Sequence, residues 1–593
     1  LSDRRGGGTA RGCGSGTVLS AVDTREAARA DFEWQLGDHL LRFGLDREVN
    51  TSDTEQEFPG SGVSNRIDDA TPGAPLNESV VPPGVTATVL TRRLQVGGVF
   101  ETLNTAYYLE DNWSITPNLL LNAGLRLEAF DNKNSDGESY IKIDDMLAPR
   151  LGFSWDMKGD GTTKLFGNIG RYFLPVSNVI NIKQAGGFLD ERRYFVLAGL
   201  EDFQFNGQTY QRPILGNQIG PVDNSQGDGT VGDLRGEVDA DMDPVYQDEL
   251  ILGFQSMIDE KWSWGARGIY RRLHNAIDDM EITDSGFCHE DLDGRRYNRV
   301  PTSVGWVMGN PGEDLKIYVD TDCDGVADSF TDIDTSREGW ALYDDDGTYV
   351  GQRGYVDPKR TYKALELVID RAWDEKWAFN AAYTLSYSEG NAEGPVNSDI
   401  GGGFLDAGRT ENFDSPYVNL NSDGPLPNDR RHQFKFRGSY AITDNWLVGG
   451  TLTAQSGRPI SPYGAGNPFD SRDYFSRYLC VDRCGTDPGT ITPDNPDGDL
   501  YKPSERVYDL AKRGSYGRLP WTFDLGASIS YLRSLGTANL RVDFSVFNIL
   551  NQERLTDLDE EFESTIGNRN NGFLQGTGYQ SPRSAQLKVS VDF

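Results

Sequence analysis

Hydrophobic and polar residues alternate along many stretches of this 593-residue chain. In the segment 537–551, Leu540, Val542 and Phe544 alternate with Arg541 and Asp543. Such alternation is typical of β-strands with one apolar and one polar face. The stretches run for about 11–15 residues, longer than most strands of soluble sheets. About sixteen strands and a terminal one are predicted, at 29–37, 39–50, 86–98, 102–115, 117–130, 146–157, 162–174, 190–199, 245–257, 260–273, 359–373, 376–389, 429–442, 445–458, 519–533, 537–551 and 582–593.

The polar faces and the connections indicate a membrane barrel. Full charges such as Arg126 and Arg437 lie on the polar parity, which a water-filled lumen accommodates and a sandwich interior does not. The turns at 259–262 and 374–377 share the sequence DEKW, whereas other connections run to tens of residues. Short turns with aromatic residues at one end and long loops at the other are typical of outer-membrane barrels. We therefore predict an all-β, transmembrane antiparallel β-barrel in the bacterial outer membrane, with long extracellular loops.

The composition agrees with this fold and excludes others. The chain has 68 glycines, 11% aromatic residues and a net charge of −34. No uninterrupted apolar run approaches the roughly 20 residues that a spanning helix needs. The strong negative charge argues against a nucleic-acid partner. We expect 1–28 to be a loop or frayed start, 29–593 to form the barrel, and 274–358 to be a long acidic extracellular loop within it.

One acidic motif has the spacing of a calcium loop. Asp320, Asp322 and Asp324 occupy its positions one, three and five, Gly325 follows, and Asp328 stands at position nine. Calcium takes six to eight oxygen ligands, and the glycine permits the sharp turn that brings them together. The glutamate expected at position twelve is absent. We predict a structural Ca²⁺ that stiffens an exposed loop; a solvated acidic loop is the alternative.

The five cysteines indicate an oxidising compartment. Cys288 and Cys323 lie in the same long loop and are predicted to form a disulfide. Cys480 and Cys484, four residues apart, are predicted to form a second, local one. Cys13 is left over. Metal binding by these cysteines is disfavoured, because no Cys-x-x-Cys pair or histidine cluster accompanies them.

The sequence shows no catalytic constellation. His39, His274, His289 and His432 are scattered along the chain, and no nucleophile elbow or phosphate-binding loop is present. We therefore expect a protein that is not an enzyme. The pattern does not identify ligand-binding residues.

Five short blocks resemble a known family. They are YYLEDNW at 107–113, NAGLRLE at 122–128, PNDRRHQF at 427–434, QSGRP at 455–459 and VFNILN at 546–551. In this order and spacing they resemble the C-terminal barrel of TonB-dependent receptors, specifically the Oar-like group. The terminal Phe593, which closes an alternating strand, is similar to the signal that the barrel insertion machinery reads.

The resemblance implies a 22-stranded barrel that imports a scarce, bulky ligand across the outer membrane. It implies as partners the outer-membrane lipid and lipopolysaccharide, the insertion machinery, and a TonB complex that acts through an N-terminal plug. This sequence shows no plug before the barrel, so residue 1 is expected to lie inside a longer receptor. Two alternatives remain open: a structural or adhesive barrel that anchors a surface protein or lipoprotein, and a passive diffusion porin.

Overall fold

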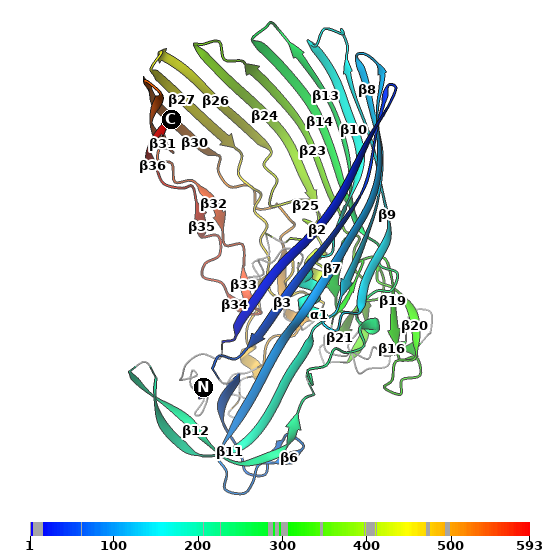
Figure 1. Cartoon of the computed structure of the whole chain (residues 1–593). Coiled ribbons are helices and arrows are strands. Elements are labelled where there is room, and N and C mark those ends of the chain that lie inside the picture. The colour runs from blue at the N-terminus through cyan, green and yellow to red at the C-terminus, as the bar shows by residue number, and fades with distance from the viewer. Residues whose placement is uncertain are drawn as a thin grey trace.

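A computed structural model shows one large sheet curved into the wall of a barrel (Figure 1). The sheet contains 20 strands. No helix in the described ranges is long and apolar enough to cross a membrane. The structure describes residues 2–3, 16–60, 62–205, 207–225, 227–282, 289–290, 296–297, 306–343, 348–396, 398, 410, 412–469, 475–490, 492 and 499–593.

Fifteen strands of the sheet form the wall, and each pairs antiparallel with the next. In the described part, β2 and β36 form the two edges, each paired on one side only. The wall strands are β2 (Val18–Leu36), β3 (His39–Glu57), β7 (Ala87–Thr116), β8 (Leu119–Lys133), β9 (Ser139–Asp156), β10 (Thr163–Leu174), β13 (Val245–Met257), β14 (Trp262–His274), β23 (Arg360–Arg371), β24 (Trp377–Gly390), β26 (His432–Thr443), β27 (Trp446–Gln455), β30 (Thr522–Leu535), β31 (Ala538–Phe547) and β36 (Ser584–Asp592).

The alternation of the sequence matches the two faces of the wall. Leu125 and Leu127 are exposed on the outer face, while Arg126 between them points inward and pairs with Glu128. Large apolar side chains exposed on one face are expected where lipid, rather than water, covers the surface. The short turns lie at the top of Figure 1 and the long connections at the bottom. The predicted all-β antiparallel barrel is thus confirmed.

Two predicted boundaries were wrong. The first wall strand begins at Val18, not near residue 29, so much of 1–28 is strand rather than loop. Its early residues include Ser20, Thr24 and Glu26 on the outer parity, where the strand extends beyond the apolar band. Alternation of apolar and polar residues is not required there, so the sequence pattern did not indicate this part of the strand.

The predicted strands 86–98 and 102–115 are one continuous strand, the 30-residue β7. The gap left between the two predictions, 99–101, is also strand, and Gly97 and Gly98 before it continue the strand at φ 146° and 152°. The predicted strand 190–199 exists within β11 (Gly187–Phe205), but lies outside the wall. It pairs with the first half of β7 and with β12 (Gln208–Asp223), in an extension at the bottom of Figure 1.

The long connections contain their own secondary structure. The large sheet also contains three short strands at the extracellular end of the wall. They are β1 (Ser2–Asp3), β4 (Val63–Asp69) and β25 (Gly424–Pro425). Separate two-stranded sheets pair β5 (Pro75–Leu76) with β6 (Ser79–Val80), β15 (Asp278–Met280) with β18 (Val307–Gly309), β16 (His289–Glu290) with β17 (Arg296–Tyr297), β19 (Asp314–Val319) with β20 (Ser329–Asp334), β21 (Trp340–Tyr343) with β22 (Tyr349–Arg353), β28 (Tyr478–Asp482) with β29 (Val507–Leu510), β32 (Leu555–Leu558) with β35 (Gly576–Tyr579), and β33 (Glu563–Thr565) with β34 (Asn568–Arg569). The helices are α1 (Asn178–Gln184) and α2 (Pro416–Asn419), with 3-10 turns at Leu234–Gly236, Pro488–Thr490 and Pro503–Glu505.

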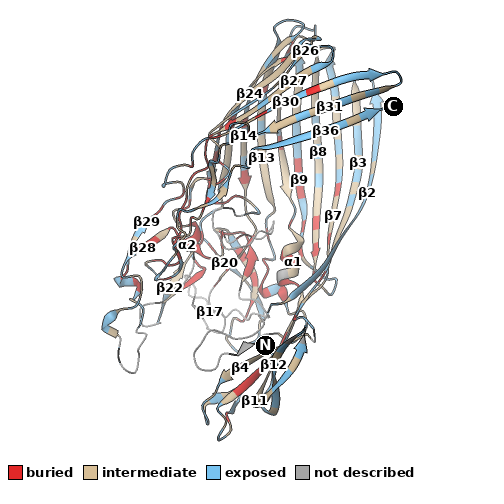
Figure 2. Cartoon of the chain, turned by 90° about the vertical axis from the view of Figure 1, so that its left-hand side faces the viewer, coloured by how far each residue is buried: buried red, intermediate tan, exposed pale blue. Residues whose placement is uncertain are grey.

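Most of the buried core lies in these connections, and β7, β8 and β9 of the wall contribute Phe100, Phe130 and Met146 to it. Figure 2 shows buried residues concentrated around α1, β20 and α2, below the strands of the wall. One cluster of fully or nearly fully buried residues includes Leu315, Ile317, Ile333 and Phe413. The extracellular segments therefore pack on one another and form a folded unit. We call this unit the cap, and define it as the described residues of 231–243, 276–355 and 391–428.

Candidate functional site

The acidic loop 320–328 of the cap connects β19 to β20. Carboxylate oxygens of Asp320, Asp322 and Asp328 lie within 4.8 Å of one another. Asp320 is fully buried and accepts the backbone N–H of Gly325 at 2.7 Å, which closes the turn. Three carboxylates at this separation are suited to one hard cation.

Asp324, which the spacing also predicts as a ligand, does not join this group. Its carboxylate accepts the N–H of Val326 at 2.9 Å. Its negative charge raises the pKa of Asp322. Burial acts to raise the pKa of Asp320, but the N–H groups of Gly325 and Asp324 outweigh it and hold that pKa below its usual value. The structure therefore brings together three of the four predicted aspartates.

Other carboxylates of the cap lie close together. Burial and the charges of Asp243 and Asp357 raise the pKa of Glu313 to about 7. Burial and the charge of Asp279 raise the pKa of Asp278 well above its usual value. Because the folded cap binds these protons more tightly than an unfolded chain would, both groups favour the folded cap at low pH, and that contribution is lost as pH rises through the raised pKa.

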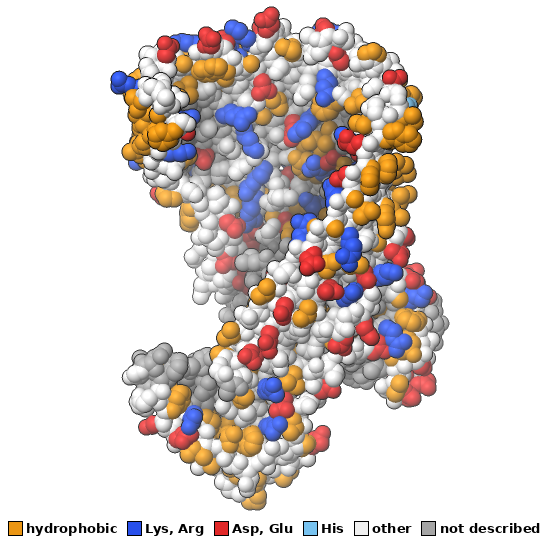
Figure 3. Space-filling model, in the orientation of Figure 1, with side chains coloured by type: hydrophobic (Ala, Val, Ile, Leu, Met, Phe, Trp, Pro, Cys, Tyr) orange, Lys and Arg blue, Asp and Glu red, His pale blue; other side chains and the backbone are white. Residues whose placement is uncertain are grey.

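Ion pairs line the inner face of the wall. Figure 3 shows Lys and Arg side chains on this concave surface. Most of these arginines pair with a carboxylate on the same or the adjacent strand: Arg42–Glu33 at 2.8 Å, Arg126–Glu128 at 2.7 Å, Arg271–Glu249 at 2.6 Å, Arg541–Asp543 at 2.9 Å, and Arg267–Glu366. The lumen is therefore a charged, hydrated surface, as the polar parity predicts.

A buried ion pair attaches the last extracellular loop, 552–581, to the wall. Arg458, just after β27, donates to Oε2 of Glu560 at 2.7 Å. The side chains are only 8% and 4% exposed. Glu560 also accepts the N–H of Ser461, and Asp557 accepts a second bond from Arg458. The pair fixes the loop in one position over the end of β27.

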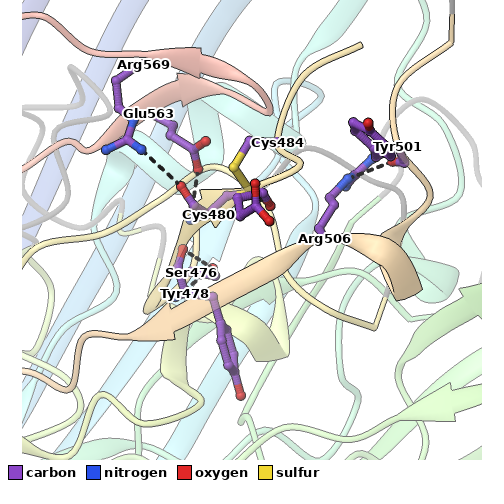
Figure 4. Close-up of a disulfide and its surroundings, with 9 residues drawn as sticks. Ser476, Tyr478, Cys480, Cys484, Tyr501, Arg506, Glu563 and Arg569 are labelled. Atoms are coloured by element: carbon purple, nitrogen blue, oxygen red, sulfur yellow. Dashed lines mark hydrogen bonds between the residues drawn. A yellow bond between two sulfur atoms is a disulfide. The ribbon is translucent and has the colours of Figure 1, made fainter. Parts of the chain in front are cut away.

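The structure contains the predicted local disulfide (Figure 4). Cys480 and Cys484 are bonded, with their Cα atoms 5.7 Å apart. The backbone of Cys480 also contacts the next hairpin: its N–H donates to Glu563 at 3.4 Å, and its carbonyl accepts from Arg569 at 3.5 Å. Both sulfurs are used in the disulfide, so this cluster of two cysteines and a glutamate is not suited to hold a metal.

Of the other predicted disulfide, only Cys323 lies within the described residues. Cys323 is disulfide-bonded. Cys288 and Cys13 lie outside the described residues. The pairing of Cys288 with Cys323 therefore stays a prediction.

The remaining candidates are dispersed. His39, His274 and His432 lie on β3, β14 and β26, three separate strands. The side chain of His289 is outside the described part. Phe593 follows β36, and its side chain is fully exposed. Its role as an insertion signal stays a prediction.

The comparison with protein families decides what kind of chain this is. A family model described as the outer membrane beta barrel domain matches residues 5–145 and 130–586. The chain belongs to this family. This outer membrane β-barrel is accordingly an integral protein of the outer membrane, as predicted.

One curated relative is similar to nearly the whole chain. The β-barrel is 23% identical over 607 residues to the TonB-dependent transporter Oar of Myxococcus xanthus, an alignment that covers 94% of this chain and 49% of the relative. The chain thus spans about half the length of this relative. The match agrees with the predicted resemblance to Oar-like receptors. The relative is named as a transporter, not as an enzyme.

Solved structures are similar over nearly the whole chain. The outer membrane transporter YddB from Escherichia coli is 13% identical with a TM-score of 0.49, over 99% of this chain and 57% of that one. The siderophore receptor PiuA from Acinetobacter baumannii is 11% identical with a TM-score of 0.41, over 98% of this chain and 56% of that one. In both cases the chain spans less than two thirds of the neighbour.

Two features of the β-barrel were missed from the sequence. Arg458 and Glu560 are 102 residues apart, and nothing in the motif around either residue indicates the other. Trp340 and Tyr417, whose ring centroids are 6.2 Å apart, are separated by 77 residues in the sequence. Contacts between residues so far apart in the sequence can be recognised only in the folded structure.

Proposed function

We propose that this chain is the barrel and surface-loop part of a TonB-dependent importer that takes up a scarce, bulky ligand. The observation that carries the proposal is the similarity to a named TonB-dependent transporter along 94% of the chain. In this proposal the extracellular cap captures the ligand. A TonB complex then supplies the energy for entry, through a plug of the kind that such receptors have in the lumen.

The packing of the cap supports capture rather than passive diffusion. Leu315, Ile317 and Val319 of β19 are fully buried within it, and Tyr355 donates from its hydroxyl to the carbonyl of Glu281 at 2.9 Å. Binding is stronger when the loops that contact a ligand are ordered beforehand, because less freedom is lost on association. A passive porin has no such need for a buried core in its loops.

Untargeted uptake measurements test the function. We expect two mutants of the source bacterium, one without this gene and one without TonB, to leave the same solute in the medium, with depletion at least about tenfold slower than in the parent. Mass spectrometry of the supernatant over time measures this. A solute that depends on this gene but not on TonB would indicate a porin. Loss of a surface protein or lipoprotein, with uptake unchanged, would indicate an anchor.

We also propose that Asp320, Asp322 and Asp328 bind a structural Ca²⁺. Their oxygens are close enough to share one cation. Asp322 makes no ion pair in the described part of the chain, and the charge of Asp324 raises its pKa. A bound cation would relieve this repulsion. It would also hold the loop between β19 and β20 rigid at the surface of the cap.

Limited proteolysis tests the calcium proposal. For the millimolar affinity usual in extracellular modules, about 10 mM Ca²⁺ should slow cleavage within 320–328 about tenfold relative to EDTA. Asp322→Asn should be cleaved at the fast rate in both conditions. Asp324→Asn is the matched control, because an asparagine still accepts the N–H of Val326, and Ca²⁺ should still protect it. Protection of Asp322→Asn, or none in the unmodified protein, would contradict the proposal.

A further inference from the structure

A cleft of about 510 Å³ lies between the cap and the turn that joins β8 to β9. Three segments that are far apart in the sequence form it: this turn, the 3-10 turn Leu234–Gly236 with its neighbours, and the start of β20 (Figure 1). The volume is in the usual range of small-molecule sites. We call it the cap cleft; six of the side chains that line it are Glu138, Ser139, Asp233, Arg235, Asp239 and Phe330.

One wall of the cap cleft contains an exposed aromatic ring. Phe330 is 43% exposed, and its ring centroid lies 5.2 Å from that of Tyr318, the residue opposite it in the hairpin of β19 and β20. The guanidinium of Arg235 lies 4.1 Å from the centroid of the same tyrosine ring. Phe330 and Arg235 therefore both contact Tyr318, which brings an apolar ring and a hydrogen-bond donor to the same wall.

Carboxylates line the rest of the cap cleft. Asp233 accepts from Nε and Nη2 of Arg235, at 2.9 and 2.5 Å. Asp239 is only 5% exposed and accepts the backbone N–H of Lys316 at 3.0 Å. Glu138 is exposed, and its carboxylate makes no ion pair or hydrogen bond within the ranges that the structure describes. Glu138 is thus the carboxylate that is available to a ligand.

The segments around the cleft are ordered by their own hydrogen bonds. Oδ1 of Asn134 accepts the N–H groups of Asp136 and Glu138, at 3.0 and 2.8 Å, and so fixes the turn after β8. Oδ1 of Asp233 accepts the N–H of Arg235 at 3.1 Å and caps the 3-10 turn. A cleft that is formed before binding loses less freedom on association, which favours affinity.

The groups of the cap cleft select the chemistry of its ligand. An anion is disfavoured, because three carboxylates face it and one cation does not balance them. A cation is disfavoured by Arg235 in the same wall. A hydroxyl group both donates and accepts, so it can donate to Glu138 and accept from Arg235 or Ser139. The C–H groups of a sugar ring carry partial positive charge and pack on the negative face of an aromatic ring such as Phe330.

We propose that the cap cleft binds an uncharged oligosaccharide. One sugar ring packs on Phe330, and its hydroxyls donate to Glu138 and accept from Arg235. The oligosaccharide is then the ligand that the proposed importer takes up, and this part rests on the proposed function. Binding at the cleft needs no TonB complex, so the site and the import can be tested separately.

An array of neutral oligosaccharides, probed with the intact protein in a detergent without a sugar headgroup, tests the site. Isothermal titration calorimetry then compares variants with the glycan that binds best. We expect Phe330→Ala to bind about tenfold more weakly, since the contact with the sugar ring is lost, and Phe330→Tyr to stay within about threefold. Glu138→Ala should also bind about tenfold more weakly, because it loses a hydrogen bond to a charged acceptor.

Two matched variants remove similar groups outside the cleft. Tyr349→Ala removes another exposed aromatic ring of the cap, and Asp136→Ala removes an exposed carboxylate of the same turn as Glu138. Both should bind the glycan like the unmodified protein. The shift of the folded barrel on an unheated gel verifies that each variant is assembled.

Four results would overturn the proposal: no glycan binds, Phe330→Ala binds normally, the matched variants lose as much affinity, or an oligolysine peptide binds more tightly than any glycan. Uptake of the bound glycan by the source bacterium tests the function separately. Uptake that continues without TonB would contradict the proposed importer and leave the assignment of the cleft intact.

Discussion

Replacing Arg458 by methionine is expected to free the last extracellular loop, 552–581, from the wall. Glu560 would then keep its charge at a position where its side chain is only 4% exposed. Removing one partner of a buried ion pair costs about 3–5 kcal/mol, because the remaining charge stays buried and loses the attraction of that partner. Amide hydrogen exchange in β32 and β35 should therefore become about 100-fold faster or more, as measured by mass spectrometry on the detergent-solubilised protein.

Two further variants separate charge from packing. In Arg458→Met/Glu560→Gln the buried charge is gone, while the amide oxygen still accepts the N–H of Ser461, so exchange should return close to the original rate. Arg541→Met removes the arginine of an exposed pair in the wall and should change exchange in the loop by less than about threefold. If exchange in Arg458→Met stays at the rate of the unmodified protein, the ion pair does not hold the loop. The same follows if exchange in the double variant is as fast as in Arg458→Met.

The wall could be predicted because one of its faces meets lipid and the other meets water. This contrast imposes alternation on every residue within the apolar band, as in Leu125, Arg126 and Leu127. Beyond the band the contrast disappears. The first residues of β2 and residues 99–101 of β7 were therefore not predicted as strand, because a strand beyond the apolar band has no required pattern.

The local sites could be predicted only where their residues are close in sequence. Cys480 and Cys484 are near enough that their pairing follows from spacing, and the aspartates of 320–328 converge within a single turn. The cap could not be predicted, because its core joins segments that are far apart. The buried residues of β19 alternate just as a wall strand does, so their pattern alone does not distinguish a loop hairpin from a membrane strand.

Replacing Trp340 by alanine is expected to separate two segments of the cap. Trp340 is 2% exposed and meets Tyr417 of α2 edge-on at 6.2 Å, and Tyr417 stacks on Phe469 at 5.9 Å. Truncation of a buried tryptophan costs about 3–5 kcal/mol, since the cavity cannot fully close. Hydrogen exchange in β21 and α2 should become about 100-fold faster or more. If the cap captures the ligand, uptake should fall with this loss of order.

Trp373→Ala makes the same chemical change at a site that is 47% exposed, beside the short turn after β23. Exposed substitutions usually change stability by no more than about 0.5 kcal/mol, so exchange in the cap should stay as it was. The wall strands β23 and β24 should exchange slowly in both variants, because the cap has a core of its own. Faster exchange of these strands in Trp340→Ala would mean that cap and wall unfold together. Unchanged exchange at α2 would mean that the aromatic contact does not join the two segments.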